Sequence, residues 1–239
     1  MTSYNMRKNS VWRIKTKRYV AFLDILGFKD YVLRHSIDDV YMRLKTLNGF
    51  RPEDDCSDYD SEEGKRIKFT IFSDSIFIFS KDDTFLNLRF FLTYVKRVMR
   101  MALREEIPLK GAIAYGDIVV DEEQNLFCGQ PIIDAYLLEE DLQYMGVVFH
   151  HTFEEVYEKL TDTQFHRIKG WIKEVPTPFK YGKRIHLNLN FPVAGAKTYN
   201  FSKIVESQRF YSSGDSRKYV DNTLEILSLF SDDGIEKRK

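Results

Sequence analysis

The feature that most constrains this chain is an apolar run that ends in a carboxylate and is followed by a glycine. Tyr19 to Leu23 form the run, and Asp24 follows it directly. Gly27 then precedes Phe28, which opens an amphipathic segment. This pattern predicts a buried strand, a tight turn and a helix. A carboxylate at the end of such a strand can hold a divalent cation, and the N–H groups of the turn and helix start can hold phosphate oxygens.

A second acid lies at the tip of a predicted hairpin. Two runs rich in β-branched and aromatic residues, 66–72 and 76–80, flank the polar triplet Ser73-Asp74-Ser75, a pattern typical of a β-hairpin. An aspartate in such a turn most often only shapes the turn. If the hairpin pairs with the first strand, however, this aspartate lies beside Asp24. The two carboxylates and the carbonyl of Ile25 would then form a hard oxygen site that suits Mg²⁺ or Mn²⁺.

The order of the predicted elements indicates an α+β fold. After the first strand we expect a helix broken near Ser36, the hairpin, a long helix, a strand, a third helix and a short strand, at 28–47, 66–80, 84–106, 108–115, 129–143 and 147–149. This β-α-β-β-α-β order predicts a ferredoxin-like core with its helices on one face of an antiparallel sheet, followed by a C-terminal α/β extension.

The rest of the chain is expected to complete the same domain. The expected parts are a basic N-terminal arm (1–18), the core (19–150) and an extension that completes the core's domain (151–239). Prolines and a glycine predict an irregular segment over 171–183. The elements expected after it are a strand at 185–190 and closing helices at 199–210 and 217–230. The acidic run 53–63 is expected in a surface loop.

Composition argues against several classes of function. Lys plus Arg and Asp plus Glu number 36 each, so the overall charge predicts neither a nucleic acid nor an anionic membrane as partner. Cys56 and Cys128 offer no disulfide framework, which favours a reducing compartment. No apolar run is long enough to span a membrane, and no signal peptide is evident, so we expect a cytoplasmic protein. His150 and His151, expected on a strand, would point to opposite faces and could not share a metal ion.

Four segments resemble, in order and spacing, the motifs of the class III nucleotidyl cyclase family. Phe22-Leu-Asp24-Ile25-Leu-Gly27-Phe28 resembles the first metal motif, and Phe72-Ser-Asp74-Ser resembles the second. Residues 109–117 are similar to a conserved family strand, and 127–139 to the segment that leads into the dimer-interface helix. The resemblance covers about residues 19 to 150.

This resemblance implies the class III cyclase catalytic fold and a set of site residues. Two Mn²⁺ or Mg²⁺ ions would be held by Asp24, Asp74 and the carbonyl of Ile25. The backbone N–H groups of Gly27 and Phe28 would hold the leaving diphosphate. The family also implies a homodimer whose active sites take residues from both protomers.

Four positions depart from the purine cyclases of this family. Thr70 and Leu126 stand where those enzymes carry base-reading residues, so the pocket should read a different base edge. Ile133 and Leu137 stand where the family carries a transition-state Asn and Arg, and neither side chain can stabilise charge. Another cation must then act if the chain is active. Lys180 is preferred, because it resembles the phosphate-binding lysine of a late strand; the other candidates are Lys183, Arg97 and Lys110.

The combination of retained aspartates and missing purine readers resembles the bacterial pyrimidine cyclases of the Pycsar antiphage system. That resemblance implies conversion of a pyrimidine triphosphate, either UTP, which is preferred here, or CTP, to the 3′,5′-cyclic nucleotide and diphosphate, and a separate effector that reads the product. Two alternatives stay open. One is a catalytically inactive cyclase-like module that binds nucleotide or dimerises. The other is a palm-like nucleotidyltransferase such as a diguanylate cyclase, although the Gly-Gly-Asp/Glu-Glu-Phe hairpin of that class is missing.

Overall fold

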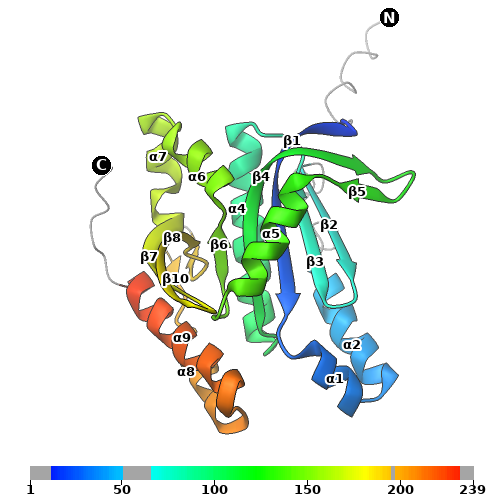
Figure 1. The fold of residues 1–239 in the computed structure, drawn as a ribbon, viewed down its shortest axis with the longest axis vertical. Helices are drawn as coiled ribbons and strands as arrows, with labels where there is room; N and C mark the ends of the chain where they lie inside the picture. Colours follow the sequence, from blue (N-terminus) through cyan, green and yellow to red (C-terminus); the bar gives the residue numbers. More distant parts are fainter. Residues whose placement is uncertain (1–11, 51–65, 195–196, 232–239) are drawn as a thin grey trace, which may run out of the picture.

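The computed structural model describes residues 12–50, 66–194 and 197–231, and it places most of their strands in one sheet (Figure 1). The strands are β1 (Lys15–Ile25), β2 (Ile67–Phe72), β3 (Ser75–Ser80), β4 (Leu109–Asp121), β5 (Leu126–Cys128), β6 (Val147–Phe149), β7 (Ile172–Phe179), β8 (Gly182–Leu189), β9 (Val193–Ala194) and β10 (Lys197–Thr198). The helices are α1 (Phe28–Arg34), α2 (Ile37–Asn48), α4 (Phe85–Arg104), α5 (Gln130–Asp141), α6 (His151–Glu158), α7 (Asp162–Ile168), α8 (Ser202–Ser207) and α9 (Gly214–Ser231).

The sheet contains the predicted ferredoxin-like core. Its strands run in the order β2-β3-β1-β4-β6-β8-β7, and β5 pairs with β4. The four strands β2, β3, β1 and β4 are antiparallel neighbours, whereas β6 lies parallel to β4. The βαββαβ order and the α+β class are therefore confirmed, and the extension adds β8 and β7 to the same sheet.

Helices cover both faces of the sheet, so the expectation that they lie on one face was wrong. Tyr19 on β1 contacts Phe91 on α4, with ring centroids 6.0 Å apart. Phe22, three positions after Tyr19 on the same strand, contacts Tyr136 on α5, with ring centroids 5.5 Å apart. Because successive strand residues point to opposite faces, α4 and α5 lie on opposite sides. This coverage explains why the apolar run of β1 is continuous, because a strand that is covered on both faces has no polar side.

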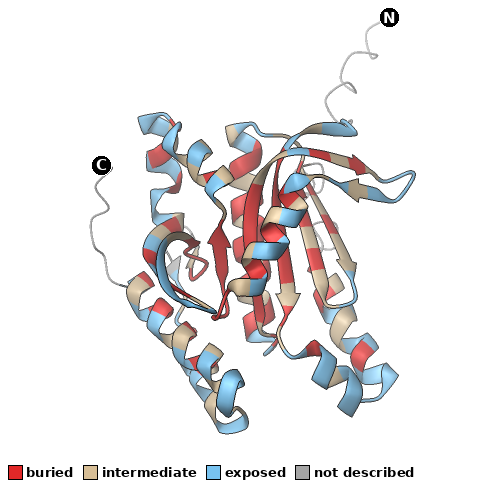
Figure 2. Ribbon diagram, in the orientation of Figure 1, coloured by how far each residue is buried: buried red, intermediate tan, exposed pale blue. Residues whose placement is uncertain are grey.

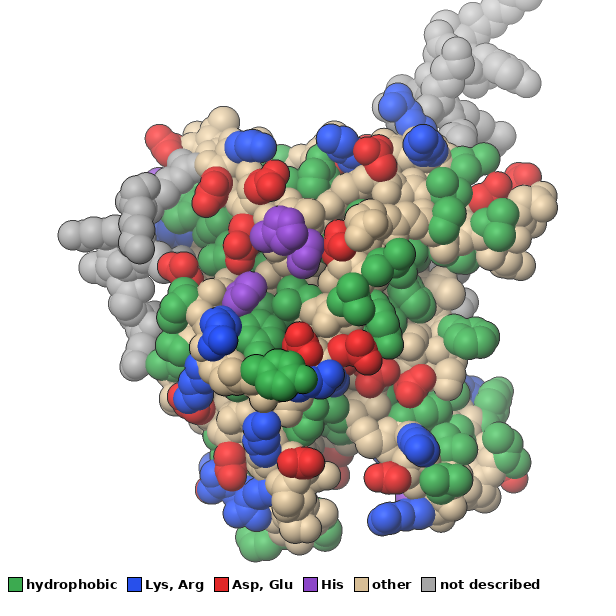
Figure 3. Space-filling model, viewed as in Figure 1, with side chains coloured by type: hydrophobic (Ala, Val, Ile, Leu, Met, Phe, Trp, Pro, Cys, Tyr) green, Lys and Arg blue, Asp and Glu red, His purple; other side chains and the backbone are tan. Residues whose placement is uncertain are grey.

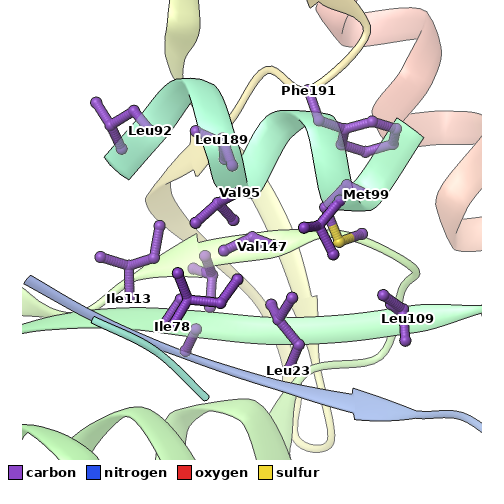
Figure 4. Packing of buried hydrophobic residues seen from close by; sticks show 14 of the residues in the cluster. Leu23, Ile78, Leu92, Val95, Met99, Leu109, Ile113, Val147, Leu189 and Phe191 are labelled. Atoms are coloured by element: carbon purple, nitrogen blue, oxygen red, sulfur yellow. The ribbon is translucent and has the colours of Figure 1, made fainter. Parts of the chain in front are cut away.

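The core lies mainly between the sheet and α4. Figure 4 shows Leu92, Val95 and Met99 of α4 packed over Leu23 and Ile78. Buried residues therefore run along the central strands, while the outer turns of the peripheral helices are exposed (Figure 2). This packing fixes β1, and with it the positions that β1 gives to the candidate site.

Several element boundaries differ from the expectations. The predicted break near Ser36 is confirmed, because Ser36 caps α2 by a capping box with Asp39. β1 begins at Lys15, so the last part of the expected basic arm belongs to the sheet, and the Arg18 side chain is buried. Residues 1–11, and the acidic run 53–63 with Cys56, lie outside the described residues.

The extension is more regular than expected. The segment 172–179 is strand β7, despite Pro176 and Pro178. It lies at the edge of the sheet, where a proline removes no necessary ladder hydrogen bond. His150 and His151 are not on a strand, because His150 caps α6 and His151 is its first residue. Their rings lie 4.0 Å apart rather than on opposite faces. Among the described helices, none combines the length and apolar character that a membrane span requires.

Candidate functional site

The structure brings Asp24 and Asp74 to one end of the sheet. Asp24 is the penultimate residue of β1, and its cross-strand partners are Ser75 on β3 and Lys110 on β4. The N–H of Ile25 donates to the carbonyl of Asp74 at 3.2 Å. The hairpin tip therefore sits directly beside the end of β1, as the sequence predicts.

The turn after β1 is held by its backbone. Gly27 has φ of 73° and ψ of 13°, a left-handed conformation that glycine adopts without strain. The N–H of Leu26 donates to the carbonyl of Pro108 at 3.0 Å, which ties the turn to the start of β4. No side chain caps the start of α1 at Phe28. The turn thus lies at the same end of the sheet as Asp24, and the role of its N–H groups toward phosphate stays a prediction.

The site holds excess negative charge. Burial, and after it the neighbouring carboxylates of Glu139 and Asp74, raise the pKa of Asp24 to about 7, whereas Lys110 acts to lower it. Figure 3 shows acidic side chains gathered in the middle of the face that carries α5, bordered by apolar side chains. A site of this kind favours a cation, because a divalent ion would offset the repulsion between the carboxylates.

Glu139 and Lys110 are the site residues that sequence reasoning missed or ranked low. Lys110 Nζ lies 2.8 Å from Glu139 Oε1 and donates to the Glu139 carbonyl at 2.9 Å. Both residues are buried, at 7% and 3% exposure. A charged residue near the end of a helix, like Glu139 in α5, gives no signal of burial in a single sequence. Only the pairing of β1 with β4, and the packing of α5 across both, brings the two charges together.

The two expected base-reading positions lie far apart in one protomer. Thr70 pairs with Phe77, which pairs with Phe22, so this row shares the face of Asp24. Leu126 is 57% exposed and pairs with Asp121 at the other end of β4. Lys110 is the residue of β4 that lies opposite Asp24. At about 3.3 Å per residue, Leu126 lies on the order of 35 Å along the strand from Lys110.

The positions of the missing transition-state pair are apolar and exposed. Ile133 and Leu137 on α5 are 52% and 54% exposed, and Tyr136 between them is 42% exposed. These side chains form an apolar surface, the α5 patch, defined here as Ile133, Tyr136 and Leu137. Neither Ile133 nor Leu137 can stabilise a phosphate.

The structure reduces the candidate replacement cations to two. Arg97 lies on α4, across the sheet from the site, and stacks on Tyr94. Lys183 forms an ion pair with Glu225 on α9. Lys180 follows β7, and its Nζ lies 3.5 Å from Asp141 Oδ1 at the end of α5, with its side chain 43% exposed. Lys110, opposite Asp24 on the neighbouring strand, and Lys180, beside the end of α5, are the two candidates that lie on elements next to the carboxylates.

The donor set fits a hard divalent cation. In the part of the chain that the structure describes, no three His, Cys, Asp or Glu side chains converge enough to hold a metal ion alone. The two aspartates would therefore act with the carbonyl of Ile25 and with oxygen atoms of a bound ligand. An all-oxygen set of this kind suits Mg²⁺ or Mn²⁺.

Comparison with known proteins gives a result only at the level of structure. No protein-family model and no curated protein sequence matches this chain. The catalytic core of a rhodopsin-guanylyl cyclase with converted specificity, solved in complex with ATPalphaS, is similar with a TM-score of 0.50 and 12% identity. The match covers 73% of this chain and 96% of that one. This chain has the class III cyclase fold.

Weaker similarity extends to the adenylyl cyclase CyaB from P. aeruginosa, with a TM-score of 0.45 and 12% identity over 78% of this chain and 98% of that one. At 12% identity the likeness to the guanylyl cyclase core concerns the fold alone. The residues of the site then have to support any activity by their own chemistry.

Proposed function

We propose that this protein is a nucleotidyl cyclase that depends on a divalent cation and converts a nucleoside triphosphate to the 3′,5′-cyclic nucleotide and diphosphate. The observation that carries the proposal is the convergence of Asp24 and Asp74 at the open end of β1, in a chain with the class III cyclase fold. Two carboxylates that repel each other offer no structural benefit, so their pairing favours a role with a cation.

Each part of the site has a place in this reaction. Asp24, Asp74 and the carbonyl of Ile25 would hold two Mn²⁺ or Mg²⁺ ions, which supply charge neutralisation of the triphosphate and a lowered pKa of the ribose 3′-hydroxyl. The N–H groups of Gly27 and Phe28 would hold the leaving diphosphate. Lys180, which follows β7 and pairs with Asp141 at the end of α5, would offset the charge that develops on the transferred phosphate.

The proposed substrate is a pyrimidine nucleotide, UTP first and CTP second. Support comes from Thr70 and Leu126, which offer neither the charged acceptor nor the charged donor that would read a purine edge. Thr70 would face the base with a neutral hydroxyl that can donate or accept. By resemblance to the Pycsar cyclases, the product would be a cytoplasmic second messenger of antiphage defence, read by a separate effector.

The proposed active form is a homodimer through the α5 patch. Three exposed apolar side chains on one helix are the kind of surface that a partner covers. The placement of Leu126 far from Asp24 in the same chain supports sites completed by a second copy. A single protomer would then be inactive.

A second candidate function is a cyclase-like module that binds nucleotide or dimerises without catalysis. The apolar Ile133 and Leu137, at positions that need polar side chains in the family, favour it. The two proposals differ in one observable, which is the formation of a cyclic product.

Incubation of the protein with each of the four nucleoside triphosphates and Mn²⁺, followed by mass spectrometry of the products, tests the proposal. We expect cyclic UMP from UTP and loss of product in Asp24→Ala and Asp74→Ala. Asp215→Ala, which removes an exposed carboxylate in the first turn of α9, is the matched control and should keep full activity. If no nucleotide gives a cyclic product while Mn²⁺ binds, the inactive module is the correct reading.

A further inference from the structure

The buried pair of Lys110 and Glu139 joins β4, next to the end of β1 that carries Asp24, to α5. Lys110 lies opposite Asp24 in the β1–β4 register, so both side chains emerge on the α5 face. Its ammonium group forms an ion pair with the Glu139 carboxylate at 2.8 Å and donates a hydrogen bond to the Glu139 main-chain carbonyl at 2.9 Å. Tyr219 of α9 covers the lysine, with its ring centroid 6.0 Å from Nζ. The pair is therefore enclosed by three elements: β4, α5 and α9.

Stability alone gives little reason to keep such a pair. Moving two charges out of water costs several kcal/mol per ion, and their attraction often only balances that cost. An apolar pair of similar volume would fill the same space. The position of the pair, next to Asp24 rather than elsewhere in the core, indicates a role connected with the cation site.

The two members of the pair act on Asp24 with opposite signs. Lys110 is a positive charge on the neighbouring strand, and Glu139 is a negative charge on the helix above it. Both charges, and that of Asp74, act on Asp24. Together the pair is neutral, so the site keeps the charge of its two aspartates; removal of one member would shift that charge by one.

We propose that Lys110 and Glu139 are positioning residues that set the affinity of the Asp24 site for its divalent cation. Lys110 limits the negative charge around Asp24, and Glu139 prevents the lysine from occupying the cation's place. The inference rests on the proposed function, because the proposed function assigns the cation to Asp24 and Asp74. The inference adds Lys110 and Glu139 to the site and states the direction in which each changes the affinity for the cation.

Titration with Mn²⁺ alone, without nucleotide, tests this inference by electron paramagnetic resonance of the free ion. Lys110→Met leaves three carboxylates without a counter-charge, so we expect Mn²⁺ to bind about tenfold more tightly. Glu139→Gln leaves an uncompensated lysine beside Asp24, so we expect binding about tenfold weaker. The double variant removes both charges and should return to within about threefold of the original affinity.

A matched control is the exposed ion pair of Lys183 and Glu225. Lys183→Met and Glu225→Gln change the same charges at the surface, where screening is strong, and should leave Mn²⁺ affinity unchanged. Circular dichroism checks that each variant folds, and Lys110→Gln and Glu139→Met replace any first-choice variant that does not.

The outcomes separate the inference from the proposed function. Opposite shifts for the two single variants support the inference, because a purely structural pair would lower affinity in both. If the original protein binds Mn²⁺ and Asp24→Ala does not, but the Lys110 and Glu139 variants titrate like the original, the inference is overturned and the proposed function stands. If the original protein binds Mn²⁺ no better than Asp24→Ala, both are overturned.

Discussion

Asp24→Asn should make the cation-free protein more stable at pH 8 and leave its stability nearly unchanged near pH 4. The ordinary pKa of an aspartate is 3.8, and in the folded protein burial and the neighbouring acids raise the pKa of Asp24 to about 7. Between these values the folded chain keeps a proton that the unfolded chain has lost. Stability therefore falls as the pH rises from about 4 to about 7, and an asparagine removes this penalty.

The size of the effect follows from the same pKa values. One pKa unit corresponds to about 1.4 kcal/mol, so a fully desolvated carboxylate would cost about 4 kcal/mol once ionised. Asp24 is only partly buried, and solvent screens part of this cost. We therefore expect Asp24→Asn to gain about 1–2 kcal/mol in the free energy of unfolding at pH 8.

Urea denaturation in EDTA, at pH 5, 6, 7 and 8, measures this difference. The gain should grow steadily with pH, and Asp215→Asn, an exposed control, should show no gain at any pH. Addition of Mn²⁺ should stabilise the original protein and not Asp24→Asn, because only the former keeps the carboxylate. A gain that is absent at pH 8, or that is equally large at pH 5, would refute the electrostatic reasoning about Asp24.

Three further predictions concern the interface, the phosphate cation and the sheet. Leu137→Glu places a charge in the α5 patch, so sedimentation should show monomers and the cyclic product should disappear. The control Phe210→Ser changes an exposed aromatic side chain outside α5 and should remain dimeric; a dimeric Leu137→Glu variant would contradict the proposed interface. Lys180→Met should lower kcat on the order of a hundredfold with Mn²⁺ affinity unchanged; an unchanged kcat would leave Lys110 as the candidate. Gly111→Ala would place its Cβ well inside van der Waals contact with Phe22 O and Leu23 Cδ2, so thermal unfolding should show a loss of about 3 kcal/mol in the free energy of unfolding. A loss under about 1 kcal/mol would mean that β1 and β4 can separate without cost.

The local parts of the site were predictable from sequence because they depend on short-range patterns. The strand that ends at Asp24, the turn at Gly27 and the hairpin with Asp74 at its tip each follow from alternation, apolar runs and turn residues within about ten positions. The pairing of hairpin and first strand then follows from the βαββ order.

The rest of the site depends on contacts that no local pattern encodes. Lys110 and Glu139 meet only because α5 crosses the face opposite to α4, and the apolar run of β1 was the one signal of that second covered face. The prolines of β7 predicted an irregular segment, but an edge position makes them compatible with a strand. The exposure of Ile133 and Leu137 could not be read from their apolar character, which by itself favours burial.

The central claim is that Asp24 and Asp74 hold cations beneath a nucleotide. Anomalous diffraction from crystals grown with Mn²⁺ and a non-hydrolysable UTP analogue tests it directly. The account predicts anomalous peaks within metal-ligand distance of both carboxylates and of the Ile25 carbonyl, with the triphosphate over the Gly27 turn. Mn²⁺ located elsewhere, or a nucleotide bound away from these two aspartates, would contradict it.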